Sequence, residues 1–140
     1  MIVYAESSAV LAWLLGELAA PSVRSVLAEA ERVVASTLTP LECARALARG
    51  AALGQLSAGD AREGQRLLEG ATRGWALLEL TGSPVERAKG RFPKEPVRTL
   101  DALHLATALE FQDTLGALTL LSLDERIRAN GAALGMSPAP

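Results

Sequence analysis

The chain has 140 residues and a net charge of −2, with 49% hydrophobic and 21% charged residues. This composition is that of a globular domain and argues against disorder, and the charge gives no general basic field for nucleic acid. The single cysteine, Cys43, and the single histidine, His104, exclude an internal disulfide and zinc sites built from several Cys or His residues.

The length fits one domain with its own hydrophobic core. We expect this domain to span residues 1–136 and to be followed by a flexible tail at 137–140. No basic stretch typical of a secretion signal opens the sequence, and the early apolar run at 9–15 is too short to cross a membrane. We therefore expect a cytoplasmic protein without a membrane partner.

Short apolar runs alternate with longer amphipathic segments along the chain. The apolar runs predict strands at 2–5, 32–36, 75–80 and 117–121. The amphipathic segments predict helices at 7–15, 21–30, 39–54, 57–72, from 83 onward, around 98–109 and at 124–133. Strands that alternate with helices favour an α/β fold in which helices cover both faces of a parallel sheet.

The helix at 39–54 begins with the outline of a capping box. Thr39 stands at the expected N-cap, Pro40 at the first helical position and Glu42 at the third. We therefore expect the side chain of Thr39 to cap this helix.

The stretch at 98–109 carries apolar residues on nearly every face, which is typical of a buried helix. Asp101 and His104 lie inside it. A buried charge is costly unless it is paired, binds a metal or takes up a proton, so Asp101 suggests a functional site. If the helix begins later than expected, Asp101 would instead cap its start.

Four acids fall where the predicted elements could bring them together: Glu6, Glu42, Asp101 and Asp124. Glu6 follows the first strand and Asp124 follows the last long one, and ligands of parallel sheets bind at the carboxyl ends of the strands. Clustered carboxylates repel one another unless a cation holds them, and oxygen ligands favour Mg²⁺ or Mn²⁺. Such ions commonly serve phosphoryl chemistry.

Three of these acids also fit purely structural roles. Glu6 fits an exposed loop or the first turn of a helix, where the helix dipole favours negative charge. Glu42 fits a solvated stripe of ion pairs with Arg45 and Arg49. Asp124 fits the N-cap of the helix that follows it, a role that is compatible with metal binding.

The remaining conspicuous side chains favour structural roles. His104 is expected to be a hydrogen-bonded, semi-buried histidine, and Cys43 a small core residue. Trp13 and Trp75 are expected in the core, since no basic residues interleave with them to form a base-stacking surface. Phosphate-binding glycine loops and the nucleophile-elbow motif are absent, and a Ser-His-Asp hydrolase would need His104 from within an apolar helix.

Four blocks of the sequence, in this order, resemble the PIN-domain ribonucleases. They are residues 3–11 (VYAESSAVL), 39–47 (TPLECARAL), 98–106 (RTLDALHLA) and 121–126 (LSLDER), the last followed by Ala133-Leu134-Gly135. The third block is the most specific, and the resemblance covers almost the whole chain. The small size resembles the VapC-type toxins of toxin–antitoxin pairs.

The resemblance implies a three-layer α/β/α sandwich with a central parallel sheet and a carboxylate pocket for Mg²⁺ or Mn²⁺. By position, it implies the catalytic residues Glu6, Glu42, Asp101, Asp124 and Ser122, and the metal ligands Glu6, Asp101 and Asp124. Ser8 matches a small polar position behind the first acid. The implied function is metal-dependent hydrolysis of RNA phosphodiester bonds by a homodimeric toxin that a small protein antitoxin neutralises.

Glu6 departs from the family, which normally has aspartate at this position. The extra methylene extends the carboxylate, and Mg²⁺ tolerates displaced ligands poorly, so we expect reduced activity. Two alternatives remain open. One is a catalytically weakened PIN fold that binds RNA or a partner, and the other is a metal-dependent phosphatase built on a similar acidic rim.

Overall fold

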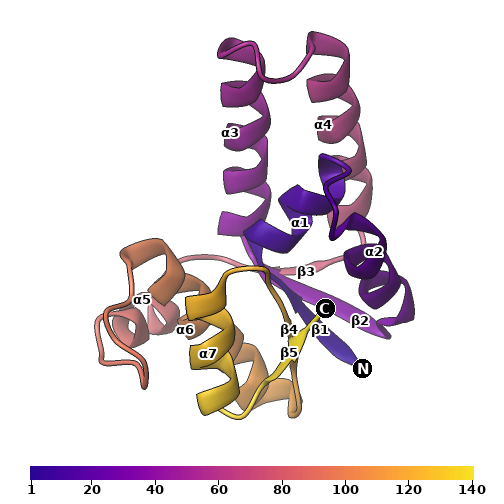
Figure 1. Cartoon of the computed structure of the whole chain (residues 1–140). Helices are drawn as coiled ribbons and strands as arrows, with labels where there is room; N and C mark the ends of the chain where they lie inside the picture. The colour runs from indigo at the N-terminus through magenta and orange to yellow at the C-terminus, as the bar shows by residue number, and fades with distance from the viewer.

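Five parallel strands form the centre of the fold in the computed structural model, which describes residues 1–140 (Figure 1). The strands are β1 (Ile2–Ala5), β2 (Arg32–Ser36), β3 (Ala76–Leu78), β4 (Thr119–Leu121) and β5 (Ser137–Ala139). They lie in the order β3-β2-β1-β4-β5, and each neighbouring pair is parallel. The predicted α/β/α fold with a parallel sheet is therefore confirmed.

Seven helices surround this sheet. They are α1 (Ser7–Leu14), α2 (Ala20–Glu29), α3 (Leu38–Ala52), α4 (Ala58–Thr72), α5 (Ser83–Ala88), α6 (Thr99–Leu115) and α7 (Glu125–Ala133). α3 and α4 form a hairpin that stands away from the sheet, while α5, α6 and α7 gather at its other side (Figure 1). None of the helices combines the length and the apolar content that a membrane crossing requires.

Strands β1 and β4 are buried on both faces, as the alternation of their side chains shows. Tyr4 and Leu120 pack in the core that includes residues of α6 and α7. Val3 and Leu121, one position away, pack on the opposite face against α1 and α2. Because successive strand residues point to opposite faces, a sheet covered on both sides needs apolar residues in unbroken runs.

The C-terminal segment differs from the expected flexible tail, because Ser137–Ala139 forms the edge strand β5. Its Ser137 N–H donates to Leu118 O and its Ala139 O accepts from the Ser122 N–H, both over 3.0 Å. The guanidinium of Arg128 also donates to Ala139 O over 2.8 Å. Proline is tolerated in such a strand because an edge position leaves one side of the backbone unpaired.

The predicted capping box at Thr39 is wrong. α3 begins at Leu38, and its N-cap residue Thr37 makes no side-chain capping bond. The Thr39 hydroxyl instead donates to Ala5 O of β1 over 2.9 Å, and Glu42 turns away from the helix start toward His104. Both side chains are therefore used for contacts between elements rather than for a local cap.

The order of the strands reverses between β1 and β4, and we expect the functional site at this reversal. Ligands of open α/β sheets bind in the crevice at such a reversal, beyond the carboxyl ends of the strands. The two strand ends are joined directly, because the Glu6 N–H donates to Leu121 O over 3.0 Å. Residues that follow β1 and β4 are thereby held next to one another.

Candidate functional site

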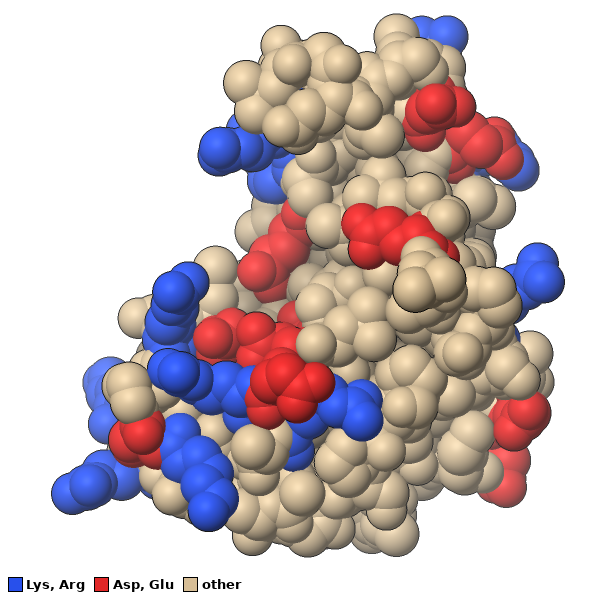
Figure 2. All heavy atoms as spheres, viewed as in Figure 1, with Lys and Arg blue, Asp and Glu red and all other residues tan.

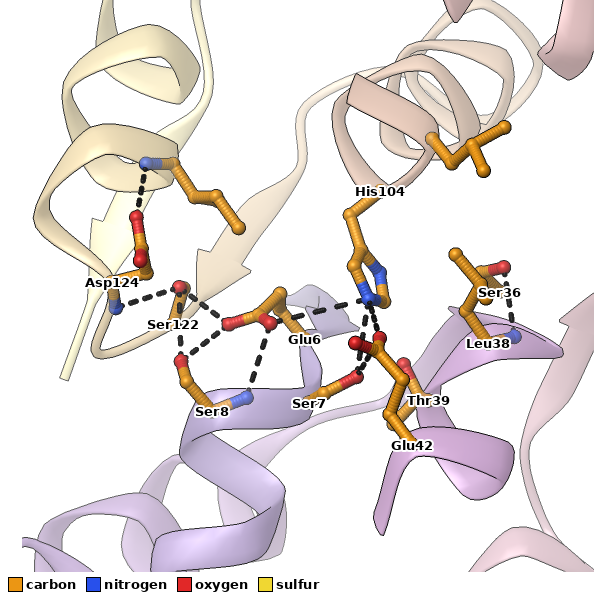
Figure 3. A network of polar contacts seen from close by, with 12 residues as sticks. Glu6, Ser7, Ser8, Ser36, Leu38, Thr39, Glu42, His104, Ser122 and Asp124 are labelled. Carbon is orange, nitrogen blue, oxygen red and sulfur yellow. Dashed lines mark hydrogen bonds and ion pairs between the residues drawn. The ribbon is translucent and has the colours of Figure 1, made fainter. Parts of the chain in front are cut away.

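The five side chains expected to form the site lie on four elements that meet at this end of the sheet. Glu6 follows β1, Glu42 lies on α3, Asp101 lies in the first turn of α6, and Ser122 and Asp124 follow β4. Figure 3 shows two hydrogen-bonded groups here, one around Glu6 and Ser122 and one around Glu42 and His104.

Glu6 is buried, with 4% of its surface exposed, and serines surround its carboxylate. It is the N-cap of α1, where its Oε1 accepts from the Ser8 N–H over 3.1 Å. Its Oε2 accepts from the Ser122 hydroxyl over 2.7 Å and from the Ser8 hydroxyl. We call Glu6, Ser8 and Ser122 the Glu6 clamp.

The Glu6 clamp also orients the chain that leads to Asp124. The Leu123 N–H donates to the Ser8 hydroxyl over 2.9 Å, and the Asp124 N–H donates to the Ser122 hydroxyl over 3.1 Å. Each serine therefore donates to Glu6 and accepts from the backbone after β4. The Glu6 carboxylate thus joins β1 to this turn, and both of its oxygens already have protein partners.

Glu42 makes its contacts with His104 and Ser7 and none with Arg45 or Arg49. Its Oε1 lies 2.6 Å from His104 Nε2 and accepts from the Ser7 hydroxyl over 2.8 Å. Burial raises the pKa of Glu42, but the hydrogen bonds from His104 and Ser7 outweigh burial and bring the pKa below its ordinary value. Glu42 is therefore ionised at neutral pH.

His104 is buried, with 1% of its surface exposed, and has partners at both ring nitrogens. Nε2 faces Glu42 and Ser7, while Nδ1 lies 2.9 Å from the hydroxyl of Tyr4. In a Ser-His-Asp triad a carboxylate would hold Nδ1. The phenol at this atom argues against a serine hydrolase built on Ser7.

Asp124 caps α7, because its Oδ1 accepts from the Ile127 N–H over 2.9 Å. Asp101 is half-buried, and it does not cap α6, whose N-cap residue is Arg98. Burial raises the pKa of Asp101, and the negative charges of Asp124 and Glu6 raise it further. The acids are therefore close enough to repel one another.

Asp101 and Asp124 face an open cleft of about 620 Å³ between the start of α6 and α7. The other residues that line the cleft are mostly charged: Lys94, Glu95, Arg98, Glu125, Arg126 and Ala129. Figure 2 shows basic side chains gathered over α7 and its surroundings, around acidic ones. The net charge of −2 thus hides a local group of basic side chains beside Asp101 and Asp124.

The structure allows a test of whether these residues fit a divalent cation. No three Asp, Glu, His or Cys side chains come together as a group that could hold a metal ion. Glu6 fits less well than the two aspartates, because its side chain is buried and its Oε2 already accepts two hydrogen bonds within the Glu6 clamp, while its Oε1 accepts one. Asp101 and Asp124 do fit, because Mg²⁺ is commonly held by one or two carboxylates and several waters.

Sequence reasoning missed the parts played by Ser7 and Lys94. Ser7 lies next to Glu6, and no local pattern separates it from the other residues of α1. Lys94 sits in a loop rich in proline, and only the packing of that loop against Asn130 brings it to the cleft. Neither Ser7 nor Lys94 could be identified from the sequence, because both reach the site through contacts between distant segments.

The sequence model of the PIN domain matches residues 3–132. Among solved structures, VapC20 of Mycobacterium tuberculosis, described as a sarcin-ricin loop cleaving toxin, is similar over 100% of both chains with a TM-score of 0.69 and 15% identity. PAE2754 of Pyrobaculum aerophilum is similar over 98% of this chain and 82% of its own, with a TM-score of 0.59 and 19% identity. No curated protein matches the sequence significantly. With the family match spanning nearly the whole chain and the parallel sheet in place, the chain belongs to the PIN-domain family.

Proposed function

We propose that this protein is an endoribonuclease that uses Mg²⁺ or Mn²⁺ to hydrolyse RNA phosphodiester bonds, and that it is the toxin of a toxin–antitoxin pair. The observation that carries the proposal is the pair Asp101 and Asp124, which share a charged cleft at the reversal of strand order. Membership of the PIN-domain family and the likeness to an RNA-cleaving toxin support it.

In this proposal Asp101 and Asp124 hold the divalent ion. The ion would supply a more acidic water and stabilise negative charge on the phosphate. Arg98, Arg126 and Lys94 attract the RNA backbone, because guanidinium and ammonium groups pair with phosphate oxygens. The Glu6 clamp does not touch the reacting atoms but fixes the turn that carries Asp124.

Glu42 supplies an acceptor for a proton on the attacking water. Its Oε1 is occupied by Ser7 and His104, whereas its Oε2 accepts no hydrogen bond from the protein. The side chain is 30% exposed, so water can reach it. An ionised carboxylate with one free oxygen can orient a water molecule and accept its proton.

The direct test is cleavage of single-stranded RNA with Mg²⁺, Mn²⁺ or a chelator, using wild type and Asp101→Asn. We expect metal-dependent cleavage by wild type, and a loss of about 100-fold or more in the variant, since removing a group that stabilises charge in the reaction costs at least this much. Asp60→Asn is the matched control, because Asp60 is exposed on α4, remote from the cleft.

A phosphomonoester substrate separates the phosphatase alternative from the ribonuclease. Hydrolysis of the phosphomonoester together with intact RNA would contradict the ribonuclease proposal. Unchanged RNA cleavage in Asp101→Asn would contradict the assignment of the site.

A second candidate function is a weakened PIN fold that binds RNA or a partner without cutting. It is favoured by the buried Glu6, whose two oxygens accept three hydrogen bonds from the protein, and by the lack of a three-residue metal group. The two candidates differ in one measurement. If the folded protein binds RNA but leaves it intact with either ion, the protein is a binding module and the ribonuclease proposal is wrong.

The proposal includes a small protein antitoxin, a homodimer and a cytoplasmic location. Large apolar side chains are exposed at Leu18, Leu41 and Leu53, and a partner that covers them would remove apolar surface from water. The molar mass in solution tests both partners. The mass of the protein by itself tests the homodimer, and the mass after co-expression with the product of an adjacent short reading frame tests the antitoxin. A monomeric mass in both samples would contradict this part of the proposal.

A further inference from the structure

We propose that His104 is a positioning residue that fixes the orientation of Glu42, by donating from Nε2 to Glu42 Oε1 so that Glu42 Oε2 stays free for the reaction. The inference deepens the proposed function and rests on it for the role of Glu42 in cleavage. The contact itself can be tested without RNA or metal. His104 lies on α6 and connects Glu42 through Tyr4 to β1, whereas Ser7, the other donor to Glu42 Oε1, lies on α1.

The contacts at Nε2 assign the direction of this hydrogen bond. His104 Nε2 lies 2.6 Å from Glu42 Oε1 and 3.1 Å from the Ser7 hydroxyl (Figure 3). The Ser7 hydroxyl donates its proton to the same Oε1 over 2.8 Å. Because an ionised carboxylate only accepts, the proton between Nε2 and Glu42 belongs to the imidazole.

The contact at Nδ1 keeps the proton on Nε2. Tyr4 is completely buried, and its hydroxyl lies 2.9 Å from His104 Nδ1. Burial, and next the charge of Glu6, raise the pKa of Tyr4 well above its ordinary value, so the phenol keeps its proton and can donate it. A phenol that donates to Nδ1 and a carboxylate that accepts from Nε2 then place the imidazole proton on Nε2, because the partner of one ring nitrogen decides where the proton on the other lies.

The arrangement matters because the Glu42 side chain is partly exposed on α3, and a side chain held by fewer hydrogen bonds samples more rotamers. Without His104, only the Ser7 hydroxyl would hold its Oε1. The carboxylate of Glu6 also lies near this nitrogen, with its Oε1 4.0 Å from His104 Nε2. The donor from His104 therefore holds Glu42 toward a region that already carries negative charge.

Two substitutions separate positioning from packing. His104→Gln keeps an N–H donor within reach of Glu42, whereas His104→Leu keeps apolar volume and no donor. We expect kcat for RNA cleavage to fall about 100-fold in His104→Leu with little change in KM, because a small misplacement of a reacting group has this effect. His104→Gln should retain kcat within about tenfold of wild type.

Leu105→Ala is the matched control for the stability of α6. Leu105 is completely buried beside His104 and makes no contact with Glu42, so it should lower the melting temperature without lowering kcat at a temperature where it is folded. Equal kcat in His104→Leu and wild type, or an equal loss in Leu105→Ala, would overturn the positioning role.

The hydrogen bond has a second readout that needs neither metal nor RNA. His104 is the only histidine of the chain, so nitrogen-15 NMR of the imidazole reports on one ring without ambiguity. We expect a proton on Nε2 that exchanges slowly with water in wild type and rapidly in Glu42→Ala. An unprotonated Nε2 would overturn the inference. If the proton on Nε2 exchanges slowly but the protein does not cleave RNA, the His104–Glu42 hydrogen bond is supported. In that case it is the ribonuclease proposal that is wrong.

Discussion

The hydroxyl of Ser122 donates to Glu6 Oε2 over 2.7 Å, and this bond connects the carboxyl end of β4 to that of β1. The same hydroxyl accepts from the Asp124 N–H over 3.1 Å. Ser122 therefore connects the buried carboxylate of Glu6 to the backbone of Asp124, the acid that lines the cleft. The connection gives Ser122 a structural role at the site, and its catalytic role stays a prediction.

Replacing Ser122 by alanine should destabilise the fold. Ser122 is completely buried, and its removal takes away one of the two donors to Glu6 Oε2 and leaves the N–H of Asp124 without a partner. Because unsatisfied buried polar groups cost about 1–3 kcal/mol each, we expect the free energy of unfolding to fall by about 2 kcal/mol in urea titrations. Ser25→Ala is the control, since Ser25 contacts only Glu29 at the surface. An equal change in both variants would contradict the support role.

Shortening Glu6 to aspartate should free a carboxylate for the metal. Aspartate cannot reach Ser8 and Ser122 as Glu6 does, so its oxygens would lose partners and become available beside Asp101 and Asp124. We expect a lower melting temperature without metal and Mn²⁺ binding about tenfold tighter, measured by calorimetry. Glu31→Asp, at an exposed site, serves as the control. If Glu6→Asp does not bind Mn²⁺ more tightly or cleave RNA faster, Glu6 does not limit the site.

Asp101→Asn should raise the melting temperature of the metal-free protein. The change removes a negative charge that Asp124 and Glu6 repel, as the raised pKa of Asp101 indicates, burial being its largest cause. Mn²⁺ should then stabilise wild type by binding its folded state, and should leave the variant unchanged. Scanning calorimetry with and without Mn²⁺ measures both effects. A variant that is less stable without metal, or that Mn²⁺ stabilises as strongly as wild type, would argue against an acidic metal site here.

The sequence alone predicts the parallel sheet and most helices because their signals are local. The apolar runs at β1 and β2 and the turn before α7 lie within a few neighbouring residues. The predicted strand at 75–80 shortens to β3, and that at 117–121 to β4, because strand ends depend on which neighbour they pair with. Glu6 and Asp124 are likewise visible in the sequence as acids that directly follow apolar runs.

Contacts between distant segments could not be predicted in this way. Ser8 and Ser122 are 114 positions apart, and only the folded sheet shows that both serve Glu6. Thr39 fits a local cap on spacing, and a longer-range bond to Ala5 replaces it. The metal ligands and catalytic residues carried over from the family stay predictions, which the experiments above address.

The pH dependence of stability should report on Glu42. Burial raises its pKa, but hydrogen bonds from His104 and Ser7 outweigh burial and lower the pKa from the ordinary 4.5. Since the folded protein has the lower pKa, it favours the carboxylate. The resulting stability is fully present above the unfolded pKa and is lost as the pH falls through the folded pKa.

Glu42→Gln isolates this contribution. We expect the free energy of unfolding of wild type to fall more steeply than that of Glu42→Gln as the pH drops below 4.5, in urea titrations at matched pH values. Above that pH the two curves should run parallel. Parallel curves throughout the acid range would mean that Glu42 gains nothing from His104 and Ser7 in the folded state.

Removing residues 137–140 should loosen the site through β5. The truncation deletes the Ala139 carbonyl, which accepts from both the Ser122 N–H and Arg128. Because each hydrogen bond contributes about 1 kcal/mol, we expect a loss of a few kcal/mol in the free energy of unfolding.

Hydrogen exchange localises the effect of this truncation. The Ser122 amide should exchange slowly in the full chain and rapidly in the truncated one, while the Glu6 amide, which donates to Leu121 O, stays protected. Arg128→Gln provides a milder test, because it removes the guanidinium that bridges Ser122 O and Ala139 O but leaves the strand itself. Since Ser122 supports both Glu6 and Asp124, a loosened β5 should also weaken Mn²⁺ binding. An unchanged exchange rate at Ser122 after truncation would show that β5 has no part in holding the site.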